Sequence, residues 1–293
     1  GRQQDWLSGL FASHPPSQER VDANIETAAK LPPGGELGVE RFEAAMARTL
    51  ETKPAYDAYD EGRKALGDKD VETARQKAEE AIALYPDEAH FYGLRGDARY
   101  VEEEYDLAVE NYDIAIRRRE NYFQYHLQRG LAHEKLGNDS SAIADLEQSN
   151  ELFPTAIATY SLGNLEAKRG NREKAIEYYT AVAGSQGEIA KAAQVALVRL
   201  DLEENPQKYI RYGCYADNAG NLIVAVANAT PVPIRDVRFV IQYRDNTGFT
   251  RSIEERIAGT IPPGERVDRN TGLGPYTQGA GCPVQIVAAY IDE

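Results

Sequence analysis

The sequence lacks the features of membrane-spanning and nucleic-acid-binding proteins. No apolar run approaches the roughly 20 residues that cross a bilayer, so we expect no membrane span in this segment. Basic residues are scarce, with 33 Lys and Arg against 47 Asp and Glu, and the net charge is −14. Because phosphate affinity depends on Lys and Arg displacing counterions, we expect no nucleic-acid partner. The chain has only two cysteines, both in its last third.

Motifs for catalysis and cofactor binding are also missing. The sequence has no phosphate loop and no Gly-x-Ser-x-Gly elbow. The string closest to the HExxH zinc motif is His133-Glu134-Lys135-Leu136-Gly137, which has a glycine in place of the second histidine. We therefore expect no catalytic residue, no metal ligand and no cofactor in this segment, and we interpret His126 and His133 as core or groove residues and His90 as solvated.

The middle of the chain contains a repeat. Gly62, Gly96 and Gly130 recur at intervals of 34 residues (96 − 62 and 130 − 96), and two further sets of mostly small residues recur at intervals of 34, 34 and 33 residues. These sets are Ala74, Ala108, Ala142 and Ala175, and Ala81, Ala115, Ser149 and Val182. Small residues at fixed positions are required where two helices of a repeat pack closely and where the next repeat docks. The pattern predicts a mainly helical solenoid of about four helix-turn-helix repeats.

These repeats resemble the tetratricopeptide repeat (TPR) along their whole length. We place them at about 55–88, 89–122, 123–155 and 156–189, with a capping helix at about 187–204 and an additional amphipathic helix over 38–50. In the first repeat, Gly67-Asp68 precedes the usual Gly-Asp position by two residues, which predicts a shorter first helix and a longer turn. The solenoid with its flanking helices is expected to occupy residues 36–204.

After Asn205-Pro206 the pattern changes to β-rich runs separated by turn residues, which predicts a small antiparallel β-sandwich over 205–293. The order of strands and turns is similar to that of bacterial FxLYD-like domains. Cys214 and Cys282 bracket this domain. We expect a disulfide between them, which would favour an oxidising compartment, although two buried free thiols would leave the same pattern.

The first residues resemble a different family. Residues 10–21, Leu-Phe-Ala-Ser-His-Pro-Pro-Ser-Gln-Glu-Arg-Val, resemble the segment that closes the catalytic domain of zinc metallopeptidases of the HtpX and BepA kind. The resemblance implies that residues 1–35 are the remnant and linker of a zinc-containing peptidase domain lying upstream. It also implies that His14 and Arg20 border the cleft of that domain. The alternatives are a loop histidine and an ion-pair arginine.

The repeat register predicts a peptide-binding groove on the first helices of the repeats. Its candidate residues are Tyr59, Arg63, Leu94, Asp97, Tyr100, Leu127, Gln128, Tyr160, Asn164 and Lys168. Their mixed aromatic and polar chemistry suits an extended peptide of a client protein. In the alternative, these side chains are solvated and the chain's own N-terminal segment fills the groove.

Two functions follow from these features. The first is the substrate-recruiting region of a secreted or periplasmic bacterial zinc metallopeptidase, for which association with the outer membrane is one option. The alternative is a free-standing TPR adaptor of a periplasmic complex. An HExxH-encoding stretch upstream of Gly1 would distinguish the first from the second.

Overall fold

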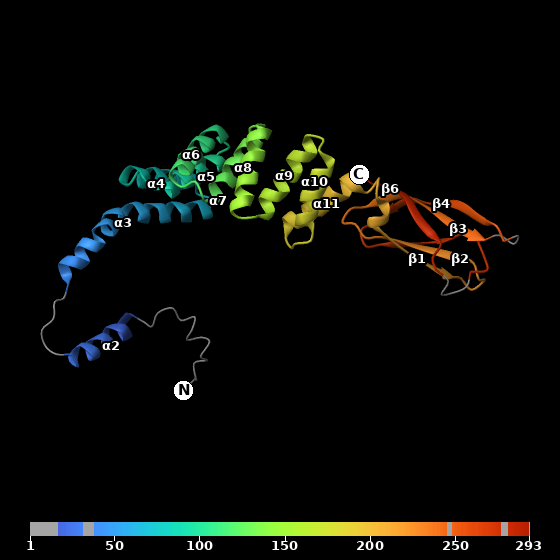
Figure 1. Ribbon diagram of the computed structural model, residues 1–293, viewed down its shortest axis with the longest axis horizontal. Helices are drawn as coiled ribbons and strands as arrows, with labels where there is room; N and C mark the ends of the chain where they lie inside the picture. Colours follow the sequence, from blue (N-terminus) through green and yellow to red (C-terminus); the bar gives the residue numbers. More distant parts are fainter. Residues whose placement is uncertain (1–16, 32–37, 245–247, 277–280, 293) are drawn as a thin grey trace. The chain divides into compact units, whose positions relative to one another are not determined.

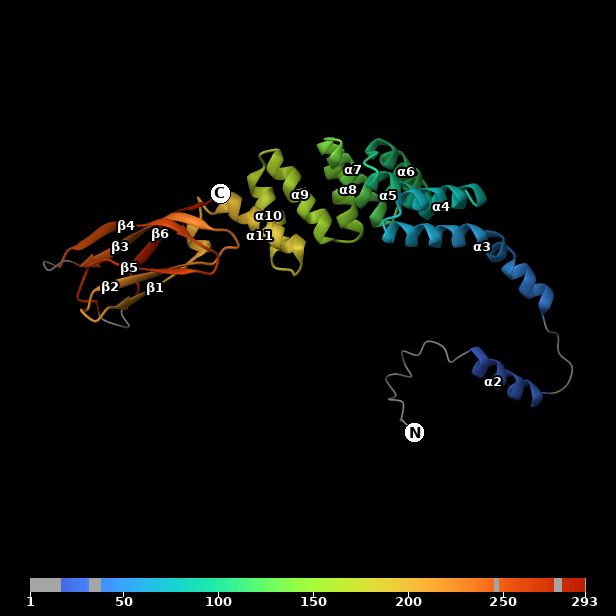
Figure 2. The same cartoon turned by 180° about the vertical axis from the view of Figure 1, so that it is seen from behind.

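The computed structural model describes residues 17–31, 38–244, 248–276 and 281–292 (Figures 1 and 2). The chain divides into two compact units, Gly1–Lys53 and Pro54–Glu293. The first unit contains helix α2 (Ser17–Ala29) and the beginning of α3 (Val39–Gly67). Among the described residues, no helix is both long enough and apolar enough to span a membrane.

Helix α3 differs from the two separate helices that the sequence indicated. It continues through Pro54, so residues 38–50 and the first helix of the first repeat belong to one 29-residue element. Proline lacks the backbone N–H that a helix interior uses, so Pro54 removes one hydrogen bond from the middle of this helix. The structure shows that the loss of one hydrogen bond does not end this helix.

The second unit contains four helix-turn-helix repeats, as predicted. The first helix of each repeat, helix A, is supplied by α3, α5 (Ala89–Val101), α7 (Phe123–Lys135) and α9 (Ala156–Lys168). The second, helix B, is supplied by α4 (Val71–Leu84), α6 (Tyr105–Arg118), α8 (Asp139–Leu152) and α10 (Arg172–Ala183). Helix α11 (Glu188–Asp201) packs against α10 at the end of the array.

The first repeat has the same turn as the others, so the prediction of a shorter helix and a longer turn was wrong. Helix α3 ends at Gly67 and α5 ends at Val101, at equivalent positions of successive repeats. In each of these turns one residue adopts the left-handed conformation, Lys69 with φ 66° and Glu103 with φ 62°. The third and fourth repeats place Gly137 and Gly170 there. Because non-glycine residues occupy the position in the first two repeats, the turn could not be located by its glycine.

The small residues of the repeat lie at the helix contacts that the pattern indicated. Ala74, Ala108, Ala142 and Ala175 are all 0% exposed, on the B helices. A Cβ atom added to Gly62 would lie 2.8 Å from Leu94 Cδ2. The requirement for small side chains is therefore steric.

Two three-stranded antiparallel sheets follow the helices, connected to them by a short 3₁₀ helix, η1 (Pro206–Lys208). One sheet has the order β1-β2-β5, and the other has the order β4-β3-β6. The strand bounds are β1 (Ile210–Ala216), β2 (Leu222–Asn228), β3 (Ile234–Arg244), β4 (Thr250–Ile261), β5 (Arg266–Asn270) and β6 (Val284–Ile291). Inward-facing residues of both sheets form one hydrophobic cluster, which confirms the predicted sandwich.

A disulfide crosslinks the sandwich, and packing joins the sandwich to α11, the last helix. The disulfide joins Cys214 on β1 to Cys282, which lies two residues before β6 of the other sheet. Val198 on α11 and the adjacent Leu202 are buried in the same cluster as the strands. Helix α11 therefore shares the core of the sandwich.

Candidate functional site

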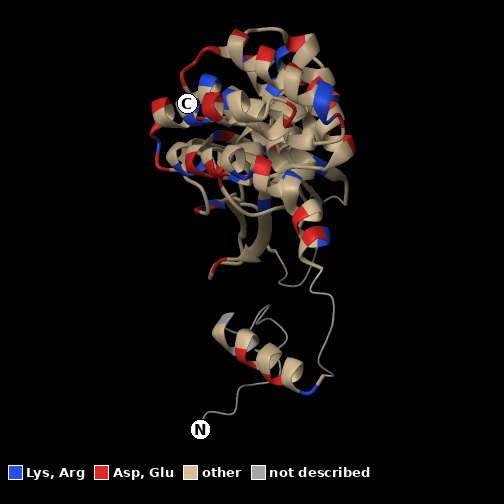
Figure 3. Cartoon of the chain, turned by 90° about the vertical axis from the view of Figure 1, so that its left-hand side faces the viewer, with Lys and Arg blue, Asp and Glu red and all other residues tan. Residues whose placement is uncertain are grey.

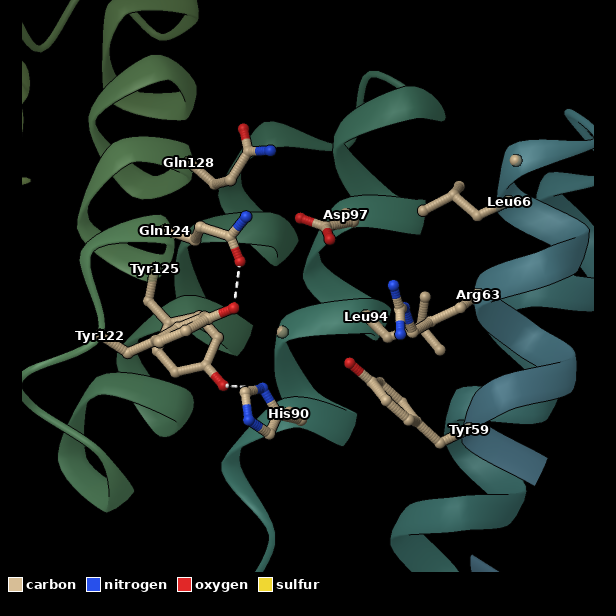
Figure 4. A pocket seen from close by; sticks show the side chains of 12 residues that line it. Tyr59, Arg63, Leu66, His90, Leu94, Asp97, Tyr122, Gln124, Tyr125 and Gln128 are labelled. Atoms are coloured by element: carbon tan, nitrogen blue, oxygen red, sulfur yellow. Dashed lines mark hydrogen bonds between the residues drawn. The ribbon is translucent and has the colours of Figure 1, made fainter. Parts of the chain in front are cut away.

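The first helices of three successive repeats enclose a pocket with a volume of about 360 Å³, called here the A-helix pocket (Figure 4). Helix α3 supplies one wall, α5 the floor, and α7 with its N-cap residue Tyr122 the opposite wall. The lining residues are Tyr59, Arg63, Leu66, Gly67, His90, Gly93, Leu94, Asp97, Tyr122, Gln124, Tyr125 and Gln128.

Aromatic rings form the end of the pocket nearest to the N-termini of α5 and α7. The ring of His90 lies 5.1 Å from that of Tyr122, 5.9 Å from that of Tyr125 and 6.1 Å from that of Tyr59. Tyr122 and Tyr125 are 4.7 Å apart, measured between ring centroids. Edge-to-face and tilted contacts of this kind are favourable arrangements of aromatic rings and hold the rings in place.

His90 is part of this wall, so its interpretation as a solvated residue was wrong. Its Nε2 lies 2.9 Å from Nη1 of Arg119, and its Nδ1 lies 2.8 Å from the hydroxyl of Tyr125. Because a guanidinium can only donate, Nε2 accepts, and a neutral ring then carries its proton on Nδ1. Burial lowers the pKa of His90, which favours this neutral form.

A glycine in α5 creates the space for the ring of Tyr125. A Cβ atom added at Gly93 would lie 2.7 Å from Tyr125 Cε1, closer than two carbons can approach. The ring therefore lies directly against the backbone of α5, and the pocket remains open above it. Burial raises the pKa of Tyr125 well above its usual range, so the hydroxyl stays protonated.

Beside the aromatic rings, the lining contains the polar side chains of Arg63, Asp97, Gln124 and Gln128 and the apolar side chains of Leu66 and Leu94. Basic and acidic residues alternate along the helices of the chain (Figure 3). Asp97 accepts a 2.8 Å hydrogen bond from the hydroxyl of Tyr112, which lies on α6 behind the pocket. Burial raises the pKa of Asp97 to about 6, although the Tyr112 bond acts in the opposite direction. The guanidinium of Arg63 lies 5.7 Å from the ring centroid of Tyr59, and Gln124 accepts a hydrogen bond from the hydroxyl of Tyr122.

Comparison with known proteins agrees with the geometry. A family model described as "Tetratricopeptide repeat" matches residues 59–122, 95–157 and 127–193. The matches overlap, and together they include every residue that lines the A-helix pocket. The chain contains tetratricopeptide repeats.

Individual relatives cover only part of the chain or are distant. Small glutamine-rich tetratricopeptide repeat-containing protein 2 of Saccharomyces cerevisiae is 28% identical over 146 residues, which are 49% of this chain and 42% of that protein. The chain thus spans less than half the length of this curated relative.

Two solved structures show the level of similarity. The Arabidopsis OM64 TPR domain is 23% identical with a TM-score of 0.40, and the match covers 40% of this chain and 98% of that one. A thermophilic TPR protein of Thermus thermophilus, TTC0263, is 21% identical with a TM-score of 0.43, and the match covers 62% of this chain and 100% of that one.

Five of the ten TPR residues predicted for a groove line the A-helix pocket. They are Tyr59, Arg63, Leu94, Asp97 and Gln128. The other five contact different parts of the array. Leu127 is buried between α7, α8 and α9, and Tyr100 packs on Tyr105. Tyr160 packs on Tyr179, which also donates a hydrogen bond to Asn164. Lys168 forms an ion pair with Asp139.

Sequence reasoning missed seven of the lining residues, at the end of α3 and around the starts of α5 and α7. Leu66, Gly67, His90, Gly93, Tyr122, Gln124 and Tyr125 line the pocket without having been predicted. A signal existed for part of this set: His90, Leu94 and Asp97 are spaced i, i+4, i+7, and so lie on one face of a helix. The contribution of Tyr122 could not be read this way because it lies at the N-cap of α7, outside the helical period.

The structure does not test the role that the metallopeptidase resemblance implies for His14 and Arg20. His14 lies outside the described residues, and Arg20 lies on α2. Within the part of the chain that the structure describes, no group of three or more His, Cys, Asp or Glu side chains is arranged to hold a metal ion. His133 is on α7, with Nε2 4.0 Å from a carboxylate oxygen of Asp145.

Proposed function

We propose that this protein is a TPR adaptor that binds an extended segment of a partner protein in the A-helix pocket. The observation that carries the proposal is the composition of the lining, in which three A helices present aromatic rings beside side-chain amides, one guanidinium and one carboxylate. A catalytic site requires groups arranged around a reacting atom, whereas this arrangement provides adjacent apolar and hydrogen-bonding surfaces.

The dimensions of the array suit an extended peptide. Packed helices are about 8–10 Å apart, so a ligand crossing from α3 to α7 spans roughly 16–20 Å. An extended chain rises about 3.3 Å per residue, so about five or six residues would cross the pocket. Gln124 and Gln128 lie one helical turn apart on α7, where their amides can pair with the peptide backbone of the bound segment.

Selection from a phage library of randomised dodecapeptides tests this function. Peptides retained by the full chain should lose about tenfold or more in affinity when Arg63→Ala and Gln128→Ala are combined. Lys168→Ala is the matched control, because Lys168 is on the A helix of the fourth repeat and pairs with Asp139 outside the pocket. Equal loss for the control and the double variant would contradict the proposed site, and retention of no peptide would contradict the function.

A competing occupant is the chain's own N-terminal segment. If residues 1–35 filled the pocket, removing them would raise the affinity for the selected peptides, because an intramolecular competitor would be lost. Our proposal predicts the same affinity for the full chain and for residues 36–293.

The alternative, a recruiting region of a zinc metallopeptidase, uses the same pocket and is supported by the resemblance of residues 10–21. The two functions differ in what the gene encodes upstream of Gly1. An HExxH-encoding stretch there would favour the recruiting region, and we would then expect the peptides that bind the pocket to belong to substrates of that peptidase.

A further inference from the structure

The A-helix pocket contains one carboxylate, that of Asp97, whose charge the fold does not require. Four equivalent positions of successive A helices are occupied by Arg63, Asp97, Leu131 and Asn164. In the second repeat, Oδ1 of Asp97 accepts a 2.8 Å hydrogen bond from Tyr112. In the fourth repeat, Oδ1 of Asn164 accepts a 2.8 Å hydrogen bond from Tyr179, the counterpart of Tyr112.

A neutral amide therefore performs the structural role that Asp97 performs. The tyrosine hydroxyl needs only an acceptor oxygen, which both Asn and Asp provide. The packing around the bond is also the same, since Gly96 and Gly163 each contact the ring of the tyrosine that donates. The negative charge of Asp97 is thus not required for the fold of its repeat.

The carboxylate of Asp97 differs from those of Asp145 and Asp201, two buried carboxylates of the TPR array, in having no cation beside it. Asp145 is paired with Arg129 through two contacts of 2.8 and 2.5 Å, and Asp201 accepts from Lys208 at 2.9 Å. Among the described residues, no Lys, Arg or His nitrogen lies within ion-pair distance of Asp97, and Tyr112 is its one hydrogen-bonding partner. Burial of this unpaired charge raises the pKa of Asp97 to about 6.

The groups that face Asp97 come from each helix around it, and they leave its charge uncompensated. The guanidinium carbon of Arg63 on α3 lies 5.7 Å from the ring centroid of Tyr59, and burial lowers the pKa of His90 on α5, which favours its neutral form. Helix α6 contributes Tyr112, a donor without charge, and α7 contributes Tyr122 and Tyr125. The lining thus combines one unpaired carboxylate with the faces of several aromatic rings, which is the chemistry that binds a cation.

We infer that Asp97 anchors a Lys or Arg side chain of the bound segment, so that the pocket selects peptides with a basic residue at one fixed position. The inference rests on the proposed function and names the chemistry of its ligand. The second carboxylate oxygen of Asp97 accepts a hydrogen bond from the ammonium or guanidinium group. The hydrocarbon stem lies against Leu94 and the aromatic rings.

The anchor makes binding depend on pH. A cation binds the ionised carboxylate, so binding below about pH 6 requires Asp97 to release a proton, and affinity falls by up to about tenfold per pH unit there. Positive charge on His90 would repel the basic side chain and so would also weaken binding. Only the Asp97 component disappears when Asp97 is replaced by Asn.

The test compares the full wild-type chain with Asp97→Asn, which keeps the acceptor for Tyr112 as Asn164 does in the fourth repeat. Asp139→Asn is the matched control, because it removes the same charge from a residue that pairs with Lys168 outside the pocket. All three proteins are used in the randomised dodecapeptide selection. The best peptide from the wild type is then measured by fluorescence anisotropy, with its basic residue intact and replaced by norleucine or citrulline.

The wild type and Asp139→Asn should enrich Lys or Arg at one position, and the neutral replacement should weaken binding about tenfold or more. Asp97→Asn should bind both forms of the peptide equally and show no enrichment. Retained peptides without a basic position, or an unchanged preference in Asp97→Asn, would overturn the inference while leaving the proposed function in place. Failure of the wild type to retain any peptide would overturn both.

Discussion

Gly96 on α5 lies directly beneath the ring of Tyr112 on α6, and a Cβ atom at this glycine would come within 2.6 Å of Tyr112 Cε1. The ring is 1% exposed, so it has no space into which it could move. This contact holds together the two helices of the second repeat and, through the hydroxyl of Tyr112, positions Asp97 in the pocket.

Replacing this glycine should therefore destabilise the repeat. We expect Gly96→Ala to lower the free energy of unfolding by about 1–3 kcal/mol, because the added methyl group forces the helices apart. Gly184→Ala is the control, since Gly184 has space around its Cα and a backbone conformation open to alanine. Urea unfolding followed by circular dichroism measures both, and equal stability of the two variants would show that the second repeat is not tightly packed.

The charge of Asp97 should cost stability at neutral pH. Because burial raises the pKa of Asp97 to about 6, the native state holds this proton more tightly than the unfolded state does. The wild type therefore loses stability as the pH rises from about 4 to about 6, by up to about 3 kcal/mol from this residue. Asp97→Asn should be more stable than the wild type at pH 7.5 and equally stable near pH 4. Thermal unfolding at the two pH values decides this, and a variant less stable at pH 7.5 would contradict the account.

Among the charged residues at the end of the TPR array, Asp201 should cause the largest loss of stability when it is replaced. Its buried carboxylate accepts hydrogen bonds from Asn205 at 2.7 Å and from Lys208 and Tyr209 at 2.9 Å. Burial acts to raise the pKa of Asp201, but these donors hold it below its usual value. Asp201→Ala would leave Lys208 and Tyr209 without their acceptor, which predicts a loss of about 2–4 kcal/mol.

The matched comparison for Asp201 is Lys168→Ala, which breaks an exposed pair with Asp139 and should change stability by about 0.5 kcal/mol or less. Chemical denaturation of both variants provides the measurement. A similar small effect for the two would mean that the contacts of Asp201 contribute little to the junction between α11 and η1.

The disulfide should stabilise the sandwich and the helix that shares its core. Cys214 and Cys282 are 68 residues apart, and the loop entropy of the unfolded chain predicts a contribution of about 4 kcal/mol. In Cys214→Ser with Cys282→Ser, hydrogen exchange should increase in the β-strands and in α11 and remain unchanged in α5–α8. Unchanged exchange throughout the strands would contradict this role for the bond.

The repeat architecture could be predicted because its determinants are local and periodic. The small residues at Gly96 and Ala108 recur at the period of the repeat, and each is required by a steric contact. The turn after α3 was misplaced for a physical reason, since Lys69 adopts a left-handed conformation that is usually assigned to glycine.

The pocket could be predicted only in part because it depends on three helices. The sequence register identified Arg63 and Asp97, which lie at equivalent positions of their repeats. It did not identify His90, whose environment is made by Arg119 and Tyr125 from the end of its own repeat and the start of the next. Such tertiary contacts decide which polar groups remain unpaired. The periodicity of the sequence does not reveal these contacts.

The central claim is that the A-helix pocket is where a partner peptide binds, and site-specific photocrosslinking tests it most directly. Gln124 is an exposed residue of the lining, so Gln124→p-benzoylphenylalanine places the reactive group at the pocket without disturbing the core. Lys168→p-benzoylphenylalanine places it on another A helix, outside the lining. We predict that irradiation crosslinks a selected peptide at position 124 and not at position 168. Crosslinking at position 168 alone, or equally at both, would contradict the assignment of the pocket.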